Sequence, residues 1–410
     1  LRSGGYENNE IYITEVMAHN RGTLADSDGE LSDWIEIANL GETAVDLSGW
    51  YLSDDPNVPD EWKIPALTLA PGEYAVIFAS GKNRTEGELH TNFSLSDGDT
   101  VILSTGNGAE TGSVKIENVP DGASLAMQPD GSFAVSDFPT PGFENTAAGY
   151  AAFCETDTRT SPLLLWEIVV YEAGSSDWVE LKNVSASPVD LSGYTLSDKF
   201  KEPARDALPA VTLAPGESYV FVCEIVGLNA QRDELYLFDA SGALCDWAFL
   251  REIPNGGSYG RQSGENGYFY FKQSTRGTEN GTGYRSVAAQ PTVDTAAGVY
   301  DGAESLTLTI TGENVHYTLD GSAPTENDAA YTAPITITET TIVRAASFPA
   351  DELPGKAVTW SYFLRENSTL PIVSLVTDPD NLTGPQGIYS NHEQAWSEKW
   401  EREATVAMYE

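Results

Sequence analysis

The sequence has little cysteine, little positive charge and no long apolar run, and each shortage excludes a class of protein. Three cysteines, Cys154, Cys223 and Cys245, occur in 410 residues, which is too few for a disulfide scaffold. Lysine and arginine total 22 against 62 aspartates and glutamates, giving a net charge of −40. Such a charge repels nucleic acids and anionic membrane surfaces. We therefore expect no nucleic-acid partner. No apolar stretch approaches the roughly 20 residues of a membrane-spanning helix, so we expect no transmembrane segment either.

The residues that are abundant favour an all-β protein of several domains. The 37 glycines and 22 prolines are spread along the chain and predict many tight turns. Most of the aromatic residues are tyrosine and tryptophan, which suit pleated surfaces. A chain of this length predicts about two to four domains. Together these features are typical of tandem β-sandwiches or barrels.

An internal repeat divides the first two thirds of the chain. Residues 33–54 align with 177–198 at a constant offset of 144, and 12 of the 22 positions are identical. Chance would give about one or two identities. Residues 69–73 match 213–217 at the same offset. Residues 120–124 match 254–258 at the shorter offset of 134. We therefore predict that residues 1–150 and 151–287 are two copies of one fold.

Within each copy the repeated residues have the pattern of strands and turns. Ile35 points to one face of a predicted strand, whereas Trp34 and Glu36 point to the other. The run 70–73 (APGE) has proline and glycine at the two central positions of a type II turn. Asn39 is expected to end its strand with hydrogen bonds from its side chain to the backbone. Folding alone explains these residues, without a ligand site shared by the two copies.

The same motifs resemble the bacterial lamin-tail domain. The first copy carries them as DWIEI at 33–37, DLSG at 46–49, LAPGE at 69–73 and PDGAS at 120–124, and the second copy ends with PNGGSYGR at 254–261. The resemblance implies two immunoglobulin-like β-sandwiches. The family has no shared enzymatic activity and often lies beside catalytic domains in exported bacterial proteins. It therefore implies a location outside the cell or on its surface.

Residues 288–366 change character and predict a third sandwich. The run 316–325 (HYTLDGSAPT) is a strand closed by an Asp-Gly turn, and 334–337 and 341–345 predict two more strands. The motif is similar to the module appended to chitobiases and hexosaminidases. That resemblance implies another immunoglobulin-like, non-catalytic sandwich.

Residues 367–410 have a different resemblance. The run 370–378 (LPIVSLVTD) predicts a buried strand, and it is followed by GIY at 387–389 and EKWEREATV at 398–406. This segment is similar to the start of the CotH-like atypical kinase domain. A kinase needs a phosphate loop, a Lys–Glu pair and metal-binding carboxylates, which this segment does not supply. The resemblance therefore implies that any catalytic residues lie beyond Glu410. We expect the segment either to lean on the third sandwich or to be partly disordered.

Two short motifs suggest enzymes, but structural roles fit them better. Residues 256–260 (GGSYG) match the pattern of a serine hydrolase, whose nucleophile needs a strand-turn-helix context that an all-β sequence does not offer. His392 and Glu393 open like a zinc-protease motif, but Trp396 occupies the position of the second histidine. We assign no catalytic and no cofactor-binding residue to this chain.

An acidic cluster is the candidate metal site. Asp26, Asp28, Glu30 and Asp33 lie within eight positions, and calcium takes several hard oxygen ligands. The spacing is not that of an EF-hand, and the second copy lacks most of these acids. The two interpretations are a calcium-binding loop and a solvated hairpin.

The sequence thus favours a non-catalytic binding, spacer or docking region of an exported bacterial surface protein. We expect it to be monomeric, with a protein or glycan ligand that the sequence does not name. The first alternative is the front part of a CotH-like kinase. The second is a carbohydrate-binding array, although Trp34 and Trp178 recur in both copies and are therefore expected to be structural.

Overall fold

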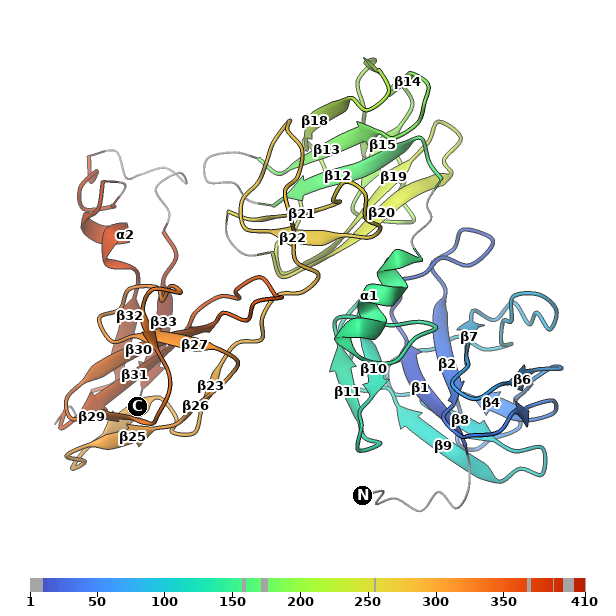
Figure 1. The fold of residues 1–410 in the computed structure, drawn as a ribbon, viewed down its shortest axis with the longest axis horizontal. Helices are drawn as coiled ribbons and strands as arrows, with labels where there is room; N and C mark the ends of the chain where they lie inside the picture. The colour runs from blue at the N-terminus through green and yellow to red at the C-terminus, as the bar shows by residue number, and fades with distance from the viewer. Residues whose placement is uncertain are drawn as a thin grey trace.

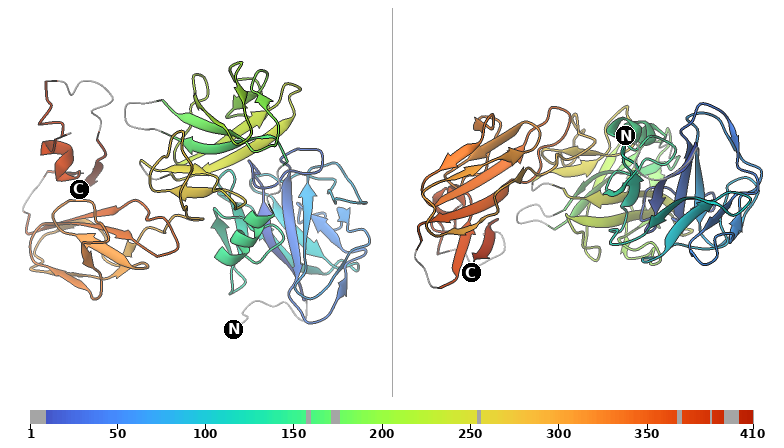
Figure 2. Two further views of the ribbon diagram at one scale, coloured as in Figure 1. Left: turned by 45° about the horizontal axis from the view of Figure 1, so that its top comes forward. Right: turned by 90° about the horizontal axis from the view of Figure 1, so that it is seen from below.

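The computed structural model describes residues 10–156, 160–170, 176–253, 256–366, 370–385, 387–393 and 402–409. Its sheets are built almost entirely from antiparallel strands, which confirms the predicted all-β class. The second copy of the repeat lies between the first copy and the third unit (Figures 1 and 2). In the part of the chain that is described, no helix is long and apolar enough to cross a membrane.

The first copy is a sandwich of two sheets with a small additional strand pair. Its strands are β1 (Ile11–Met17), β2 (Asp33–Asn39), β3 (Val45–Asp46), β4 (Tyr51–Ser53), β5 (Trp62–Lys63), β6 (Thr68–Leu69), β7 (Tyr74–Ala79), β8 (Thr100–Ser104), β9 (Glu110–Lys115), β10 (Ser124–Met127) and β11 (Phe133–Ser136). One sheet has the order β11-β10-β1-β2-β7, the other has the order β5-β4-β8-β9, and β3 pairs with β6. A continuous apolar core lies between the two sheets.

The second copy repeats this arrangement strand for strand. Its strands are β12 (Leu163–Val169), β13 (Trp178–Asn183), β14 (Val189–Asp190), β15 (Thr195–Ser197), β16 (Asp206–Ala207), β17 (Thr212–Leu213), β18 (Ser218–Val222), β19 (Arg232–Phe238), β20 (Leu244–Arg251), β21 (Ser258–Gly260) and β22 (Phe269–Phe271). The sheet orders are β18-β13-β12-β21-β22 and β16-β15-β19-β20, and β14 pairs with β17. Even the irregularity in the first strand recurs, between Ile13 and Glu15 and again between Leu165 and Glu167. The predicted duplication is therefore one of fold as well as of sequence.

The repeated turn residues do what the sequence predicts. Glu73 donates its backbone N–H to the carbonyl of Ala70 at 3.0 Å, and Gly72 has a φ of +75°, as a type II turn requires. The Asn39 amide donates to two backbone carbonyls, those of Thr43 and Leu69. Equivalent bonds form around Asn183 in the second copy.

The strand that carries Trp34 is buried on both faces. Ile35 belongs to the main core, while Trp34 packs with Met17 and Phe78 in a separate cluster on the opposite face of the sheet. Trp34 and Trp178 are both fully buried, which confirms that they are structural. Cys223 is buried, and burial raises the pKa of its thiol to about 12.

One helix interrupts the β architecture at the junction of the two copies. Helix α1 (Ala147–Glu155) begins after Thr146, whose side chain accepts a hydrogen bond from the Gly149 N–H. Such a cap satisfies one of the free N–H groups of the first turn. Its buried Tyr150 and Cys154 lie against the second copy. The sequence reasoning did not predict this helix.

The third unit is a smaller sandwich. Its strands are β23 (Thr292–Val293), β24 (Gly298–Tyr300), β25 (Leu306–Leu308), β26 (Ile310–Thr311), β27 (Val315–Thr318), β28 (Ala329–Ala330), β29 (Ile335–Ile337), β30 (Thr341–Ser347) and β31 (Val358–Leu364). The main sheet has the order β24-β31-β30-β27-β28, and β24 runs parallel to β31. The unit has its own core.

The last segment forms a hairpin, β32 (Ile372–Val376) with β33 (Thr405–Tyr409), and a short helix, α2 (Pro379–Thr383). The hairpin contacts the third sandwich, as predicted. The hydroxyls of Ser374 and Ser361 lie 2.8 Å apart, and the rings of Tyr409 and Phe363 are in contact. The predicted strand 370–378 is, however, buried on one face only. The motif residues 398–401 and Trp396 lie outside the described residues, as do Pro254 and Asn255 of the second copy.

Candidate functional site

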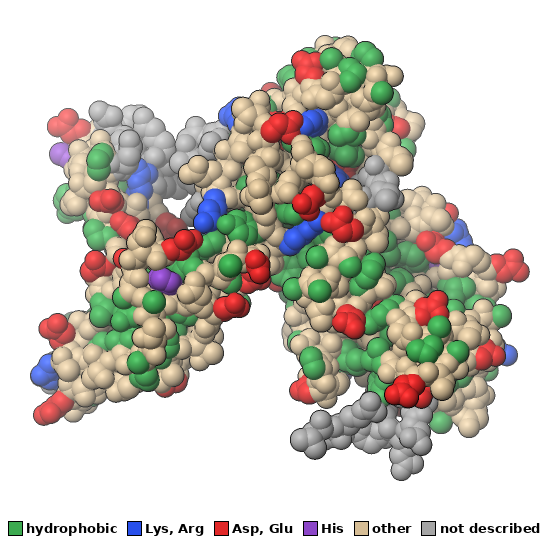
Figure 3. Space-filling view, in the orientation of Figure 1, with side chains coloured by type: hydrophobic (Ala, Val, Ile, Leu, Met, Phe, Trp, Pro, Cys, Tyr) green, Lys and Arg blue, Asp and Glu red, His purple; other side chains and the backbone are tan. Residues whose placement is uncertain are grey.

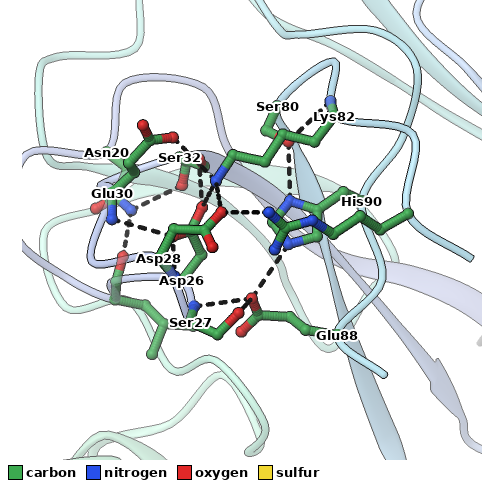
Figure 4. Close-up of polar contacts among 12 residues, drawn as sticks. Asn20, Asp26, Ser27, Asp28, Glu30, Ser32, Ser80, Lys82, Glu88 and His90 are labelled. Carbon is green, nitrogen blue, oxygen red and sulfur yellow. Dashed lines mark hydrogen bonds and ion pairs between the residues drawn. The ribbon is translucent and has the colours of Figure 1, made fainter. Parts of the chain in front are cut away.

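Three of the acidic residues singled out in the sequence, Asp26, Asp28 and Glu30, lie in the loop between β1 and β2, and Asp33 begins β2. Figure 4 shows that the three loop acids gather around the ammonium of Lys82, which comes from the loop after β7. The Lys82 Nζ lies 2.5 Å from Asp26, 2.7 Å from Asp28 and 2.9 Å from Glu30. The Arg84 guanidinium also forms an ion pair with the Asp28 carboxylate, at 2.5 Å. The site is therefore a compact network of charges of both signs.

Asp26 organises this loop. Its side chain is buried, and one carboxylate oxygen accepts the backbone N–H groups of Asp28 and Glu30, each at 3.0 Å. The other oxygen accepts the Ser32 hydroxyl at 2.9 Å. Burial alone would raise the pKa of Asp26, but the hydrogen bonds from Lys82 and the loop outweigh it and hold that pKa below its usual value. Hydrogen bonds from Lys82 and Arg84 lower the pKa of Asp28 to about 2.

The structure brings together three of the four acids predicted to bind calcium. The fourth, Asp33, instead accepts the backbone N–H of Asn20 at 2.9 Å. Among the described residues no group of three or more histidine, cysteine or acidic side chains is arranged to hold a metal. Lys82 occupies the centre that a cation would need, so the network can fold without an ion. Calcium binding stays a prediction, and it would have to displace an ammonium.

Beside this network lies a chain of serine, histidine and glutamate that the sequence reasoning missed. The Ser80 hydroxyl is 2.8 Å from His90 Nδ1, and His90 Nε2 is 3.1 Å from Glu88. The histidine ring is fully buried and stacks on Phe78 at 5.2 Å. Glu88 also accepts the N–H and the hydroxyl of Ser27 at 2.8 Å, which ties the two loops together.

The Ser80–His90–Glu88 series has the residue types of a serine hydrolase, but the backbone N–H groups next to Ser80 are not free to stabilise an oxyanion. A nucleophilic serine needs neighbouring N–H donors for the oxyanion that forms. The N–H of Gly81 donates to the carbonyl of Phe93 at 2.9 Å, and that of Lys82 donates to the Ser80 hydroxyl itself at 3.3 Å. Both adjacent donors are therefore engaged. The arrangement holds the loop in place and gives no geometry for acyl transfer.

The glycine-rich motif at 256–260 is likewise structural. Ser258 lies in β21, and its hydroxyl donates to the buried carboxylate of Glu167 at 2.6 Å. Its counterpart Ser124 donates to Glu15 at 2.5 Å in the first copy. His392 is bonded through Nδ1 to the carbonyl of Tyr389 at 3.1 Å. None of these residues occupies a strand-turn-helix elbow.

The acidic loop borders a cleft of about 780 Å³ between the two copies. The cleft contains cations from both copies, Arg21 from the first and Lys199 and Lys201 from the second. It also contains Asp33 and Glu234, and burial raises the pKa of each of these carboxyls to about 7. The partly exposed Phe200 lines the cleft, and its ring centroid lies 5.4 Å from that of the buried Tyr236. A polar ligand carrying either charge would find partners here.

Direct hydrogen bonds join the two copies at the cleft and beside it. The Tyr236 hydroxyl donates to the carbonyl of Arg21 at 2.7 Å, and the Trp247 indole donates to that of Gly22 at 2.5 Å. Arg232 donates to the carbonyl of Asp121 at 2.5 Å and also pairs with Asp137. The sequence could not predict these contacts, because residues of the second copy meet residues about 100 to 200 positions earlier.

Comparison with known families finds two family models in the chain. The family model described as Lamin Tail Domain matches residues 5–118 and 156–250. The model described as Chitobiase/beta-hexosaminidase C-terminal domain matches residues 295–359. Neither match reaches residues 367–410, so the kinase-like resemblance of that segment stays a prediction. No curated protein matches the chain.

Proposed function

Since this chain belongs to the Lamin Tail Domain family, we propose that it is a non-catalytic binding and spacer region of an exported bacterial surface protein. On this proposal the two copies hold a ligand in the cleft between them, and the third sandwich and the terminal hairpin extend the array. The observation that carries the proposal is the cleft itself. It is lined by both copies, and the Tyr236 hydroxyl in its lining donates a hydrogen bond to the carbonyl of Arg21 in the other copy.

The lining favours a protein segment as the ligand. Charges of both signs face the cleft beside the Phe200 and Tyr236 rings, and protein surfaces combine such groups with apolar side chains. The acidic side chains spread over the visible face of all three units (Figure 3) would repel strongly anionic partners. A neutral glycan is the competing ligand class, because it could stack on Phe200 and hydrogen-bond to the charged side chains through its hydroxyls.

A paired screen tests this proposal. The protein is applied to an array of extracellular-protein peptides and to a glycan array, together with the variant Phe200→Ala. The expected result is a reproducible set of peptide hits that weaken in the variant. Tyr389→Ala is the matched control, because Tyr389 is an aromatic residue that is 73% exposed in the last segment. Hits confined to one sugar class would select the carbohydrate reading, and hits unchanged in Phe200→Ala would remove the cleft as the site.

A second candidate is favoured by the terminal hairpin. Val373 lies opposite Met408, and Leu375 opposite Val406, so these four apolar side chains share one face. Each is at least 63% exposed. An apolar sheet face of this kind is usually covered by another element. We infer that further strands of a CotH-like kinase domain cover it in the native protein.

The kinase candidate has two direct tests. Reading the gene past the codon for Glu410 should reveal further strands and the Asp, Asn and Lys residues that phosphoryl transfer requires. Titration of residues 1–410 with ATP and magnesium should be silent. A stop codon at that position would remove the kinase candidate and leave the binding array. Saturable nucleotide binding to residues 1–410 would show that this region itself contains a nucleotide site.

A further inference from the structure

A second, smaller pocket lies at the junction of the two copies, lined by different residues from the cleft. Its volume is about 310 Å³. The loop 22–25 of the first copy forms one wall, helix α1 another, and strand β20 with the segment 267–268 the rest. Its aromatic lining consists of Tyr150, Phe153, Trp247, Phe249, Tyr259 and Tyr268. A volume near the low end of known ligand sites suits a small molecule.

Arg251 is the charged group of this pocket. Its side chain lines the pocket although only 8% of the residue is exposed. The guanidinium lies 5.2 Å from the centre of the Phe249 ring and 5.6 Å from that of Phe138. Among the described residues it forms no ion pair, and its Nε is buried without a hydrogen bond. The neighbouring acid Asp137 is paired with Arg232 instead.

A buried guanidinium without a carboxylate is costly, because aromatic faces replace only part of its hydration. The sandwich fold does not require it. At the offset of 134 that aligns this part of the two copies, Arg251 corresponds to Glu117, an exposed acid. The arginine is therefore specific to the second copy, where it meets the pocket.

A second unsatisfied group lines the same pocket from the opposite copy. The hydroxyl oxygen of Thr23 is buried and has no hydrogen-bond partner. Buried polar atoms are nearly always bonded, so each exception calls for an explanation. Here two such atoms belong to residues that line one pocket with an aromatic lining, one residue from each copy of the repeat. A ligand that offers an anionic oxygen and a ring would suit this lining.

We propose that this pocket binds a small aromatic carboxylate. The carboxylate pairs with Arg251 and accepts the Thr23 hydroxyl, while the ring packs among the aromatic side chains. A carboxylate fits better than a phosphate, since the net charge of −40 opposes a dianion more strongly than a monoanion. The inference is independent of the proposed ligand of the larger cleft.

Calorimetric titration with 3-phenylpropionate tests the proposal. The wild-type protein should bind it saturably, and should bind 3-phenylpropanol, which lacks the charge, about tenfold more weakly. Arg251→Gln should weaken binding of the carboxylate about tenfold and bring it level with the alcohol. The matched control is Arg205→Gln, because Arg205 pairs with Asp198 away from this pocket. Equal binding of acid and alcohol by the wild type, or full affinity in Arg251→Gln, would overturn the proposal.

The melting temperature of Arg251→Gln is measured first, and a second variant tests the proposal if Arg251→Gln does not fold. Ala25→Trp places a large side chain at the partly exposed wall of the pocket without removing a buried charge. It should lower the affinity for acid and alcohol alike. If Ala25→Trp binds 3-phenylpropionate as tightly as the wild type, the ligand does not occupy this pocket and the inference is wrong.

Discussion

Glu15 and Glu36 lie directly opposite each other on β1 and β2, and both are fully buried. They bind the segment that follows the last strands of the sheet. Glu15 accepts the N–H of Thr140 at 3.0 Å, and Glu36 that of Gly142 at 2.6 Å. The second copy repeats the pair as Glu167 and Glu180. The repeated glutamates are therefore internal anchors of the fold.

These glutamates predict that stability falls as pH rises. Burial raises the pKa of Glu15 to about 7 and that of Glu36 to about 8. The folded protein keeps protons that the unfolded chain releases near pH 4.5, so the stabilisation is complete below that pH and is lost as pH rises through 7 to 8. The Glu36 carboxyl should account for on the order of 5 kcal/mol of this loss between pH 4.5 and pH 8.

Urea unfolding between pH 5 and pH 8 measures this effect. In Glu36→Gln the unfolding free energy should fall less over that range than in the wild type, because an amide does not ionise. Glu110→Gln is the control, since Glu110 is exposed, and it should follow the wild-type curve. Parallel curves for the wild type and Glu36→Gln would contradict the role given to this carboxyl.

Lys82 predicts a second effect at the scale of one residue. Lys82→Met leaves the buried Asp26 carboxylate without its cation, which should cost about 2 kcal/mol of unfolding free energy. Calcium has to displace this ammonium in the wild type, whereas the variant has a vacated, acid-lined centre, so the variant should give more heat with millimolar calcium than the wild type. Lys63→Met, at an exposed lysine, should change neither property. Calcium heat in the wild type would show that the ion displaces the ammonium.

At the scale of elements, Gly122 holds the two sandwiches in close contact. Its φ is +69°, and a Cβ there would lie 2.3 Å from the Phe249 ring of the second copy. Its counterpart Gly256 has a φ of +78° but open space around it. Gly122→Ala should therefore strain both the turn and the joint, whereas Gly256→Ala strains the turn alone.

Limited proteolysis and thermal unfolding of the two variants separate these contributions. We expect faster cleavage between the copies and a larger loss of melting temperature in Gly122→Ala than in Gly256→Ala. Equal losses in the two variants would mean that the contact between Gly122 and Phe249 adds nothing to the joint.

The sequence predicts local features well and distant contacts poorly. The turn at 70–73 follows from proline and glycine, whose backbone preferences are intrinsic. The encounter of Asp26 with Lys82 joins residues 56 positions apart, and no spacing rule anticipates it. Helix α1 escaped notice because it is short and alanine-rich within a β context. The sequence does not single out Arg251, because only the folded interface shows that it has no acidic partner among the described residues.

At the scale of the whole molecule, the second copy is the central unit of the array. It contacts the first copy through Tyr236 and Trp247 and the third unit through a short segment around Leu353. This geometry suits a spacer, because the two outer units are each held against a common centre. It also confines the candidate cleft and the smaller pocket to the joint between the first two units.

Leu353 should control the joint between the second and third units. It belongs to the third unit in sequence, yet it is only 2% exposed and packs in the core of the second copy. Its N–H donates to Ser286 at 2.9 Å, and its carbonyl accepts the Ala288 N–H at 2.8 Å. Leu353→Ala removes a buried side chain, which should cost about 2–4 kcal/mol, and the loss falls on the contact between units. We therefore expect a larger radius of gyration by X-ray scattering and a third unit that melts separately. Leu319→Ala, at a leucine that is 46% exposed, should leave both properties unchanged.

An unchanged radius and a single melting transition in Leu353→Ala would show that other contacts hold the third unit in place. The ion pair between Lys356 and Glu252, at 3.6 Å, would then be the next contact to remove by mutation.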